Sequence, residues 1–408
     1  MGRYKLDNGV LVDNHLAYFN TPPLAISCSP EEVKEALDLI HTYTAFKLKI
    51  PFITQQALEN FDQAEFIAQY KYSADINGKA LLESLIAQFI YQQIPIGLLP
   101  NILQLSKFNL HFILDDSCFM LFETNTTRRQ ASVHMHKFYE DNNLWPNSKM
   151  TRWEEQEHRL HLLIDILLYI PMVKITISFF NRNNKILLKQ NDKTPEQLAS
   201  YVHAQIREAF QLPPYGSRPI LNKLIRAVTG ISSATILYLF TSGPPDGGQN
   251  AINKIGRLVV ERKNPAYMPL TFVNCSDDYG VADWMKDIRD DMDTNYYAQI
   301  DDFEDQRLDI AHKQGKVFPY SIGIWLVCLL ATVMSPDDLA ALNNYLPLSK
   351  FTLDNIFGRE LTPKEYDKYW SSFLKKSEYE IYKLKLETEN KCTNDILTTV
   401  KILSPKLR

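Results

Sequence analysis

Residues 109–117 read NLHFILDDS, a short apolar run that ends abruptly in two aspartates and a serine. Such a run is too short for a typical helix and suits a strand that is buried on both faces. Three later segments have the same character, at residues 173–180, 234–240 and 269–274. We therefore predict that these segments form the centre of a buried, mostly parallel sheet.

Longer segments with helical spacing of apolar residues separate these runs. They lie at residues 153–169, 195–210, 220–228, 251–261 and 281–292. Alternation of buried strands with amphipathic helices predicts an α/β fold, doubly wound and Rossmann-like, with helices on both faces of the sheet. Residues 181–184 (NRNN) suggest a turn before residues 185–188 (KILL), which predicts one antiparallel edge strand.

Helical patterns flank this region on both sides. Residues 29–32 (SPEE) and 362–365 (TPKE) have the residue types of helix starts, with a capping hydroxyl, a proline and a returning glutamate. We divide the chain into a helical N-terminal region at 1–105, an α/β domain at 106–305 and a helical C-terminal region at 306–408.

Composition narrows the range of functions. The 408 residues include 44 Lys and Arg and 48 Asp and Glu, a net charge of -4, so nothing in the overall balance attracts nucleic acid. Five scattered cysteines argue against a disulfide scaffold. The longest apolar run, residues 320–334, is too short to span a bilayer, and the first residues lack the apolar run of a signal peptide. We expect a soluble, cytoplasmic protein with no nucleic-acid partner and no membrane span.

Three loops that adjoin the predicted strands and helices contain the candidate functional residues. They read DDSCFM at residues 115–120, GSRP at 216–219 and TSGPP at 241–245, and an Arg-Trp pair at 152–153 begins the helix after the first loop. The carboxyl ends of parallel strands meet at one edge of a sheet, where such loops form binding sites.

In order and spacing, these segments resemble the von Willebrand factor type A (VWA) domain, best in its cytosolic bacterial and fungal variants. The resemblance covers about residues 105–305. It implies a metal-ion-dependent adhesion site, in which an Asp and two Ser of the first loop, a Thr of the second and an Asp of the third surround a Mg²⁺. Such an ion takes oxygen ligands and leaves one position for a carboxylate of a partner.

The implied metal site is degenerate in this chain. Asp115 and Ser117 match the first loop, and Ser217 stands in for the threonine, but Phe119 replaces the second serine and Ser242 replaces the aspartate of the third loop. Loss of one ligand and one carboxylate weakens Mg²⁺ binding. The favoured expectation is therefore no cofactor, with Asp115 and Ser117 capping loops and helix ends.

Two weaker hypotheses about a metal at these loops stay open. Mg²⁺ held by Asp115, Ser117 and Ser217 is the alternative to a metal-free site. Asp246 is a candidate replacement for the missing carboxylate of the third loop.

The function implied is a non-enzymatic protein-interaction module that binds a partner protein through these loops. The candidate binding residues are Asp115, Asp116, Ser117, Ser217 and Ser242. Residues 94–100 (IPIGLLP) add a resemblance to VWA-bearing proteins of intracellular bacterial pathogens. That resemblance implies a host protein as partner, and a secreted effector that is translocated into the host cell without a Sec signal peptide.

The alternative class is an enzyme, a hydrolase that uses Cys118 as nucleophile or the acidic cluster near Asp301. That cluster comprises Asp301, Asp302, Glu304, Asp305 and Asp309, and suits a helix start. Histidines offer weak metal signals. His158 and His161 share a helix at i, i+3 spacing without an evident second pair of ligands, which predicts a solvated or partly packed pair. His134 and His136 fall in an expected loop, and we expect no zinc there.

Overall fold

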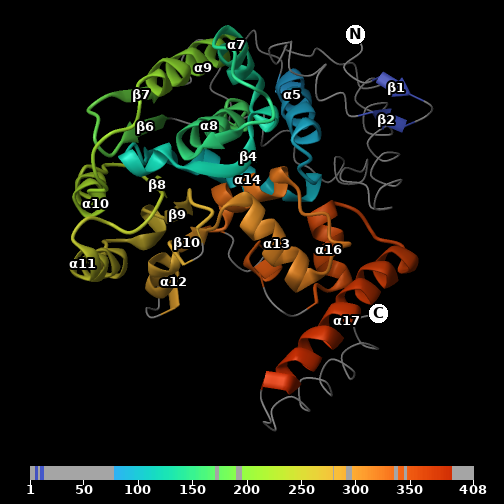
Figure 1. Cartoon of the computed structure of the whole chain (residues 1–408). Helices are drawn as coiled ribbons and strands as arrows, with labels where there is room; N and C mark the ends of the chain where they lie inside the picture. The colour runs from blue at the N-terminus through green and yellow to red at the C-terminus, as the bar shows by residue number, and fades with distance from the viewer. Residues whose placement is uncertain are drawn as a thin grey trace.

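The computed structural model describes residues 5–7, 10–12, 78–170, 174–189, 195–278, 280–290, 296–334, 339–343 and 347–387. A six-stranded sheet in the order β10-β9-β8-β3-β6-β7 lies at its centre (Figure 1). The strands are β3 (Asn109–Leu114), β6 (Ile175–Phe179), β7 (Lys185–Leu188), β8 (Thr235–Thr241), β9 (Leu270–Asn274) and β10 (Tyr297–Ile300). All pairs are parallel except β6–β7, so the predicted α/β sheet with one antiparallel edge strand is confirmed.

The apolar runs of the sequence mark five of these strands. The predicted turn at residues 181–184 joins β6 to β7, where Ile177 lies opposite Ile186. The sixth strand, β10, was not predicted, because its four residues (YAQI) include a polar one and give no clear period.

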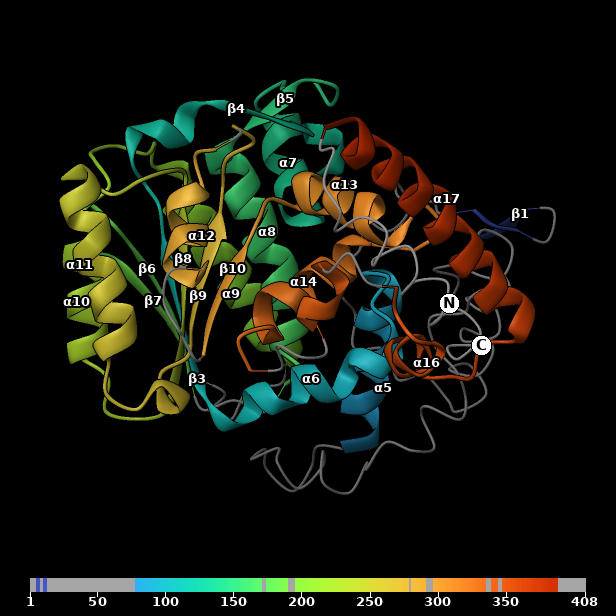
Figure 2. The ribbon, with the colours of Figure 1, turned by 90° about the horizontal axis from the view of Figure 1, so that it is seen from below.

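Helices cover both faces of the sheet (Figure 2). One face carries α10 (Ile220–Thr229), α11 (Gly248–Glu261) and α12 (Asp283–Asp290), and the other carries α8 (Arg152–Leu167) and α9 (Pro195–Gln211). Strand β3 contributes side chains to the hydrophobic cores on both faces of the sheet, because side chains alternate along a strand. Ile113 packs with the α10 and α11 side chains, whereas Phe112 packs with those of α8.

Between β3 and α8 the chain makes an excursion that was not predicted. It contains η3 (Cys118–Leu121), β4 (Glu123–Thr127), η4 (Arg128–Gln130), α7 (Val133–Asp141) and β5 (Lys149–Thr151), and β4 pairs with β5. His134 and His136 therefore lie on a helix, and their placement in a loop was wrong. Thr151 caps α8 as a capping box with Glu154, so the Arg-Trp pair begins a helix as predicted.

Further helices pack beside the α/β unit. Before the sheet come α5 (Gly78–Tyr91), η1 (Ile96–Leu98), α6 (Leu99–Leu103) and η2 (Gln104–Lys107). After it come α13 (Phe303–Gln314), α14 (Ile322–Ala331), η6 (Ala340–Asn343), α16 (Lys350–Phe357) and α17 (Pro363–Glu387). The outlying β1 (Lys5–Asp7) and β2 (Val10–Val12) form a separate hairpin, and the short η5 (Pro265–Tyr267) precedes β9.

The two flanking groups of helices contact each other. Gly97 in η1 approaches α16 so closely that a Cβ atom there would lie 1.8 Å from the backbone oxygen of Asn355. The apolar run at 320–334 forms the buried α14, and none of the helices in the described ranges has the length and apolarity to cross a membrane. Thr362 and Glu365 cap α17 as predicted, whereas the helix start at residues 29–32 lies outside the described residues.

Candidate functional site at the carboxyl edge of the sheet

Strands β3 and β8 are neighbours at the centre of the sheet, and the chain continues from them toward opposite sides. Such a switch in strand order leaves a crevice at the carboxyl ends of the two strands. Asp115 follows β3, and Ser242 follows β8. The topology thus brings the first and third predicted loops together.

Hydrogen bonds surround the Asp115 carboxylate, which is fully buried. One carboxylate oxygen, Oδ1, accepts from the backbone N–H of Ser117 at 2.9 Å. The other, Oδ2, accepts from both the backbone N–H and the hydroxyl of Ser242, each at 2.8 Å. The serine that replaces the third-loop aspartate therefore donates to Asp115.

The second loop joins the same edge through its backbone. Cys118 N–H donates to the carbonyl of Gly216 at 3.1 Å, and Tyr215 N–H donates to that of Asp116 at 2.7 Å. Gly216 has φ 84°, a left-handed conformation that favours glycine. The next residue, Ser217, is exposed, while Ser117 is buried and its hydroxyl has no hydrogen-bond partner among the described residues.

Asp116 ties the first loop to the hairpin. Its Oδ1 accepts from the backbone N–H of Asn181 at 2.7 Å, and its Oδ2 lies 3.4 Å from Nε of Arg182. Burial raises the pKa of Asp116, although the contacts with Asn181 and Arg182 oppose that shift. Arg182 also donates to the carbonyls of Ala209 and Leu212, each at 2.8 Å. Asp116 is thus part of the framework that fixes the loops.

We call the hydrogen-bonded group of Asp115, Ser117 and Ser242 the cradle. Arg218 places a positive charge beside it. A Cβ on Gly243 would lie 2.0 Å from its Nη1, which puts the guanidinium directly against the third loop. Burial lowers the pKa of Arg218, while Asp115 and Asp246 oppose the shift. Asp246 accepts from the backbone N–H of Arg218 at 3.1 Å, so its carboxylate holds the second loop.

These residues fit Mg²⁺ poorly. A bound Mg²⁺ needs carboxylate and hydroxyl oxygens that are free to coordinate it. Both oxygens of Asp115 already accept from N–H or O–H donors, and the charge of Arg218 acts against a second cation nearby. Of the three predicted metal ligands, Asp115 and Ser117 come together in the buried cradle, and Ser217 lies on its exposed rim.

Large apolar side chains project from the same rim. Leu121 is 54% exposed, Phe122 56% and Tyr215 53%, and Phe119 lies beside Phe122 with ring centroids 6.3 Å apart. Arginines hold these rings. The guanidinium of Arg218 lies 4.1 Å from the Phe119 ring centroid, and that of Arg152 lies 5.4 Å from Phe122. Arg152 is itself buried and paired with Asp278 at 2.6 Å.

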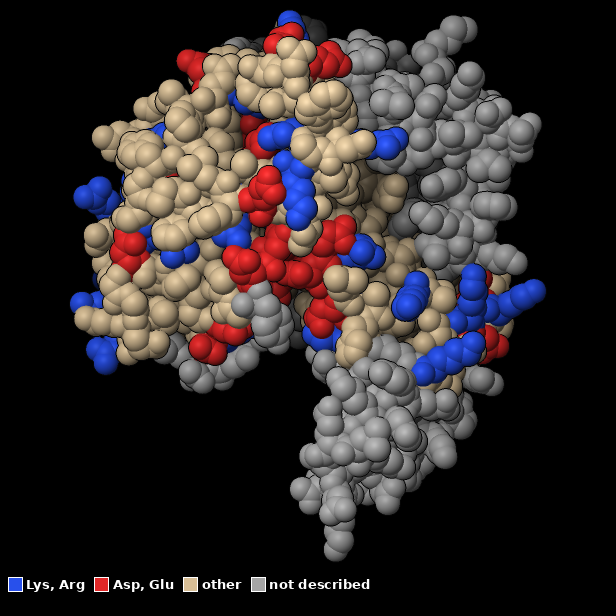
Figure 3. Space-filling model, in the orientation of Figure 1, with Lys and Arg blue, Asp and Glu red and all other residues tan. Residues whose placement is uncertain are grey.

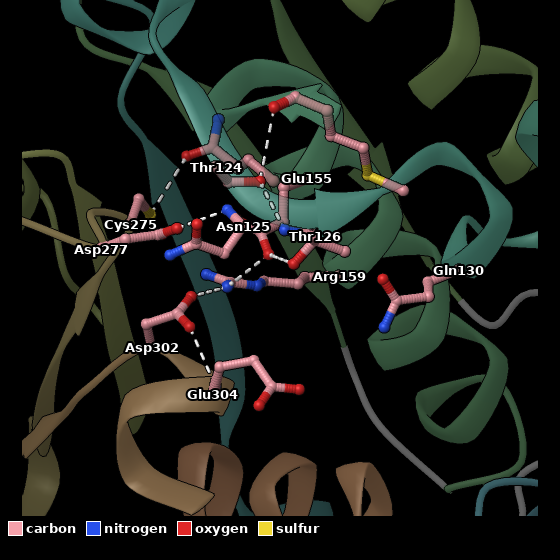
Figure 4. Close-up of polar contacts among 12 residues, drawn as sticks. Thr124, Asn125, Thr126, Gln130, Glu155, Arg159, Cys275, Asp277, Asp302 and Glu304 are labelled. Carbon is pink, nitrogen blue, oxygen red and sulfur yellow. Dashed lines mark hydrogen bonds and ion pairs between the residues drawn. The ribbon is translucent and has the colours of Figure 1, made fainter. Parts of the chain in front are cut away.

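A cavity of about 1120 Å³ adjoins this edge between β4, α7, α8, α13 and α14. Figure 4 shows polar side chains at its wall, centred on Arg159. Arg159 pairs with Glu155 at 3.0 Å and with Asp302, and Glu155 also accepts from the hydroxyl of Thr126 at 2.5 Å. Asp277 completes a group of three carboxylates, whose nearest oxygens lie within 4.8 Å of one another.

Several buried polar atoms in this cavity wall lack a hydrogen-bond partner among the described residues. They include His158 Nδ1, Glu155 Oε2, Tyr139 Oη and Gln92 Oε1. Burial lowers the pKa of His158 to about 4, so its ring is neutral at pH 7. Because buried polar groups usually find partners, these four atoms indicate room for water or a polar ligand.

The predicted acidic cluster splits into local contacts. Asp302 caps α13 by accepting from the backbone N–H of Glu304 at 2.9 Å, as a helix start requires. Asp301 lies 3.6 Å from Lys286, and Asp309 pairs with Lys313 at 2.5 Å. Figure 3 shows acidic side chains gathered near the centre of this face, beside α13, with basic side chains next to them.

A hydrolase that used Cys118 as nucleophile would need a base beside the thiol. The thiol is exposed, and no described histidine hydrogen-bonds to it. His161 is fully buried, which differs from the expected solvated or partly packed pair, whereas His158 is half-buried in the cavity wall and so is partly packed as expected. No protein-family model matches the chain, and no curated protein matches it.

Proposed function

We propose that this chain is a non-enzymatic protein-interaction module of the VWA type. It recognises a partner protein through the loops at the carboxyl edge of the sheet, without a bound metal. The observation that carries the proposal is the group formed by Phe119, Leu121, Phe122 and Tyr215, which we call the rim cluster. Its members lie in the first loop, directly after it, or directly before the second loop, and they stay exposed beside arginines.

The rim cluster has the composition of an interface hot spot. Aromatic residues and arginine dominate binding energy at protein interfaces, and a single well-buried one contributes about 2 kcal/mol or more. Isolated exposed apolar residues are common on any surface, but a contiguous group is not. Phe119, Leu121 and Phe122 are nearly consecutive, and the bond from Cys118 to Gly216 brings the backbone next to Tyr215 against their loop, while the Tyr215 hydroxyl donates to the Asn181 carbonyl.

Arginine side chains pack against the rings of the rim cluster, which favours binding through those rings. Arg152 is 5% exposed, pairs with Asp278 and lies with its guanidinium 5.4 Å from the Phe122 ring centroid. A ring already held in place loses less conformational entropy when a partner covers it. The cost of ordering the interface is therefore reduced before the partner arrives.

The charge at the cradle supports metal-free recognition. In the adhesion sites that the loops resemble, an ion bridges to the partner. Here Arg218 places a side-chain cation at that edge, and Asp115 serves as its neighbouring anion. A partner carboxylate can meet the guanidinium directly, because arginine forks suit carboxylate oxygens.

Site-specific photo-crosslinking tests this proposal. A photoreactive amino acid replaces Phe122 in one variant and Tyr267 in a control variant. Both variants are mixed with the same cell extract and illuminated identically. Tyr267 is also an exposed aromatic (42%), but it precedes β9 and so lies at the opposite edge of the sheet. We expect one protein to crosslink at position 122 and not at position 267. Equal yields at both positions would contradict the proposal.

A second candidate function is the binding of a small polar ligand in the cavity beside Arg159. The unpartnered polar atoms in the cavity wall, such as His158 Nδ1 and Glu155 Oε2, favour it. Ligand-observed NMR with a fragment library tests it, using His158→Phe to fill the cavity and Phe122→Ala as the control. Hits that disappear only with His158→Phe would support cavity binding; hits that persist in both variants would exclude it.

A further inference from the structure

Three histidines and an aspartate meet in the interior between α7, α8 and α9, away from the rim. Asp165 on α8 lies 3.3 Å from Nε2 of His134 on α7 and 2.9 Å from Nε2 of His203 on α9, both measured to Oδ1. The rings of His134 and His203 stack with centroids 3.5 Å apart. His161, on α8, lies behind His203, with 2.8 Å between the two Nδ1 atoms.

We propose that His134, Asp165 and His203 form a binding site for a transition-metal dication of the Zn²⁺ class. The ligand atoms are Nε2 of each histidine and Oδ1 of Asp165, and one ligand atom from each of the three residues lies within 4.8 Å of the other two. A tetrahedral Zn²⁺ with bonds of about 2.0 Å keeps its ligand atoms about 3.3 Å apart. The two separations from Asp165 already approach that value, and the stacked rings of His134 and His203 must turn apart for both Nε2 lone pairs to point at one ion.

The unpartnered nitrogens of the cluster are the independent observation. His203 is 6% exposed, and its Nε2 lies 2.9 Å from Oδ1 of Asp165 but does not meet the geometry of a hydrogen bond to any described residue. A buried ring nitrogen without a partner is costly. A metal on the lone pair of Nε2 satisfies that nitrogen.

The residues behind the cluster are arranged as an outer shell. A metal-bound histidine usually donates its other ring N–H to a second group. With Nε2 of His203 on the metal, its Nδ1–H donates to Nδ1 of His161. The Nε2–H of His161 then faces Oε1 of Glu157 at 3.5 Å, and Arg207 pairs with the same carboxylate at 2.6 Å. One tautomer of His203 and one of His161 thus direct their N–H groups along this chain, although the 3.5 Å separation between His161 and Glu157 exceeds that of a good hydrogen bond.

Ligand chemistry selects the metal. Two imidazole nitrogens and one carboxylate oxygen suit Zn²⁺, Co²⁺ or Ni²⁺, whereas Mg²⁺ and Ca²⁺ prefer oxygen alone. Three protein ligands leave one position for water. Of the His134 side chain 15% is exposed, against 6% of Asp165, so an ion reaches the site on the α7 side. Bound metal would fix α7 to α8 and α9.

The other group of close carboxylates does not compete for this role. Glu155 and Asp302 are both paired with the guanidinium of Arg159, which supplies their positive charge. The histidine cluster has no such cation among its ligand atoms, since Arg207 contacts only Glu157 and the Phe138 ring in the described structure.

Metal binding by the full-length, untagged chain tests the proposal. Isothermal titration with Zn²⁺ and the visible spectrum of the Co²⁺-loaded protein are measured for wild type, His134→Gln and His136→Gln. His134 is partly exposed, so its replacement should leave the fold intact, which circular dichroism checks. His136 is the matched control two residues along α7. Cys118→Ser removes the exposed thiol as a rival ligand.

We expect one tight Zn²⁺ per chain and the absorption bands of tetrahedral Co²⁺ in wild type, His136→Gln and Cys118→Ser. His134→Gln should weaken binding at least tenfold and abolish those bands. No binding to wild type, or equal binding by His134→Gln and His136→Gln, would overturn the proposal. Loss of the bands in Cys118→Ser would assign the metal to the thiol and overturn it as well.

Discussion

Replacing Asp115 by asparagine tests the cradle with the smallest change in shape. The carboxylate accepts one hydrogen bond on Oδ1 and three on Oδ2, of which the bond from the Thr241 hydroxyl is the longest at 3.5 Å, and it is fully buried. Asparagine keeps one acceptor oxygen for Ser117 N–H, but its amide group faces the backbone N–H of Ser242. The variant therefore leaves a buried backbone donor without an acceptor.

The magnitude follows from these contacts. A hydrogen bond to a charged group contributes about 1.5–3 kcal/mol, and a buried unsatisfied donor costs about 1–3 kcal/mol. Ser242 can turn its hydroxyl to accept from the new amide, which recovers part of the loss. We expect Asp115→Asn to lower the free energy of unfolding by roughly 2–4 kcal/mol. Ser242→Ala removes only the hydroxyl bond and should cost about 1–2 kcal/mol.

Urea unfolding followed by tryptophan fluorescence measures both variants. Trp153 is a suitable reporter, because it is buried and donates through Nε1 to the Phe210 carbonyl at 3.0 Å. The slope of unfolding free energy against urea should stay unchanged, so the midpoint reports stability. A loss below about 0.5 kcal/mol for Asp115→Asn, within the range of surface substitutions, would refute the reasoning. So would a larger loss for Ser242→Ala.

Three further outcomes follow from buried contacts elsewhere. Gly97→Ala places a Cβ 1.8 Å from the Asn355 carbonyl and should destabilise by about 3 kcal/mol or more in urea unfolding, whereas Gly230→Ala, which has only a 3.1 Å neighbour, should change stability by under about 1 kcal/mol. Arg159→Met leaves two buried carboxylates without their cation and should cost about 3–5 kcal/mol by the same assay. His158 has a pKa of about 4 in the folded chain against 6.5 ordinarily, so the unfolded chain binds the proton first; up to roughly 3 kcal/mol of stability, present above pH 6.5, is lost as pH falls toward 4, and His158→Gln should flatten that part of the stability–pH curve.

The sheet could be predicted because its strands differ from their surroundings in a simple way. Residues 109–114 are mostly apolar and end at two aspartates, and β8 and β9 end as abruptly. Once parallel strands are assigned, the meeting of their loops follows from topology. For that reason the proximity of Asp115 and Ser242 could be predicted from the sequence.

Features that depend on side-chain direction could not be predicted. Arg218 stands in the quoted second loop, but only the structure shows its guanidinium against Gly243. The residues of the histidine cluster lie between positions 134 and 203 on three helices, without the fixed spacing of a metal motif. The i, i+3 spacing of His158 and His161 was a signal, but the histidines that His161 contacts, His134 and His203, are on other helices.

The most direct test of the central claim is the dissociation constant of the partner that crosslinks at position 122, measured by titration in excess Mg²⁺ and again in EDTA. We predict equal constants within about twofold in the two buffers, and at least tenfold weaker binding by Phe122→Ala, about 1.4 kcal/mol, with Tyr267→Ala unchanged. A constant that weakens tenfold in EDTA would show that an ion bridges the complex and would contradict recognition by the rim cluster and Arg218. So would a Phe122→Ala variant that binds like wild type.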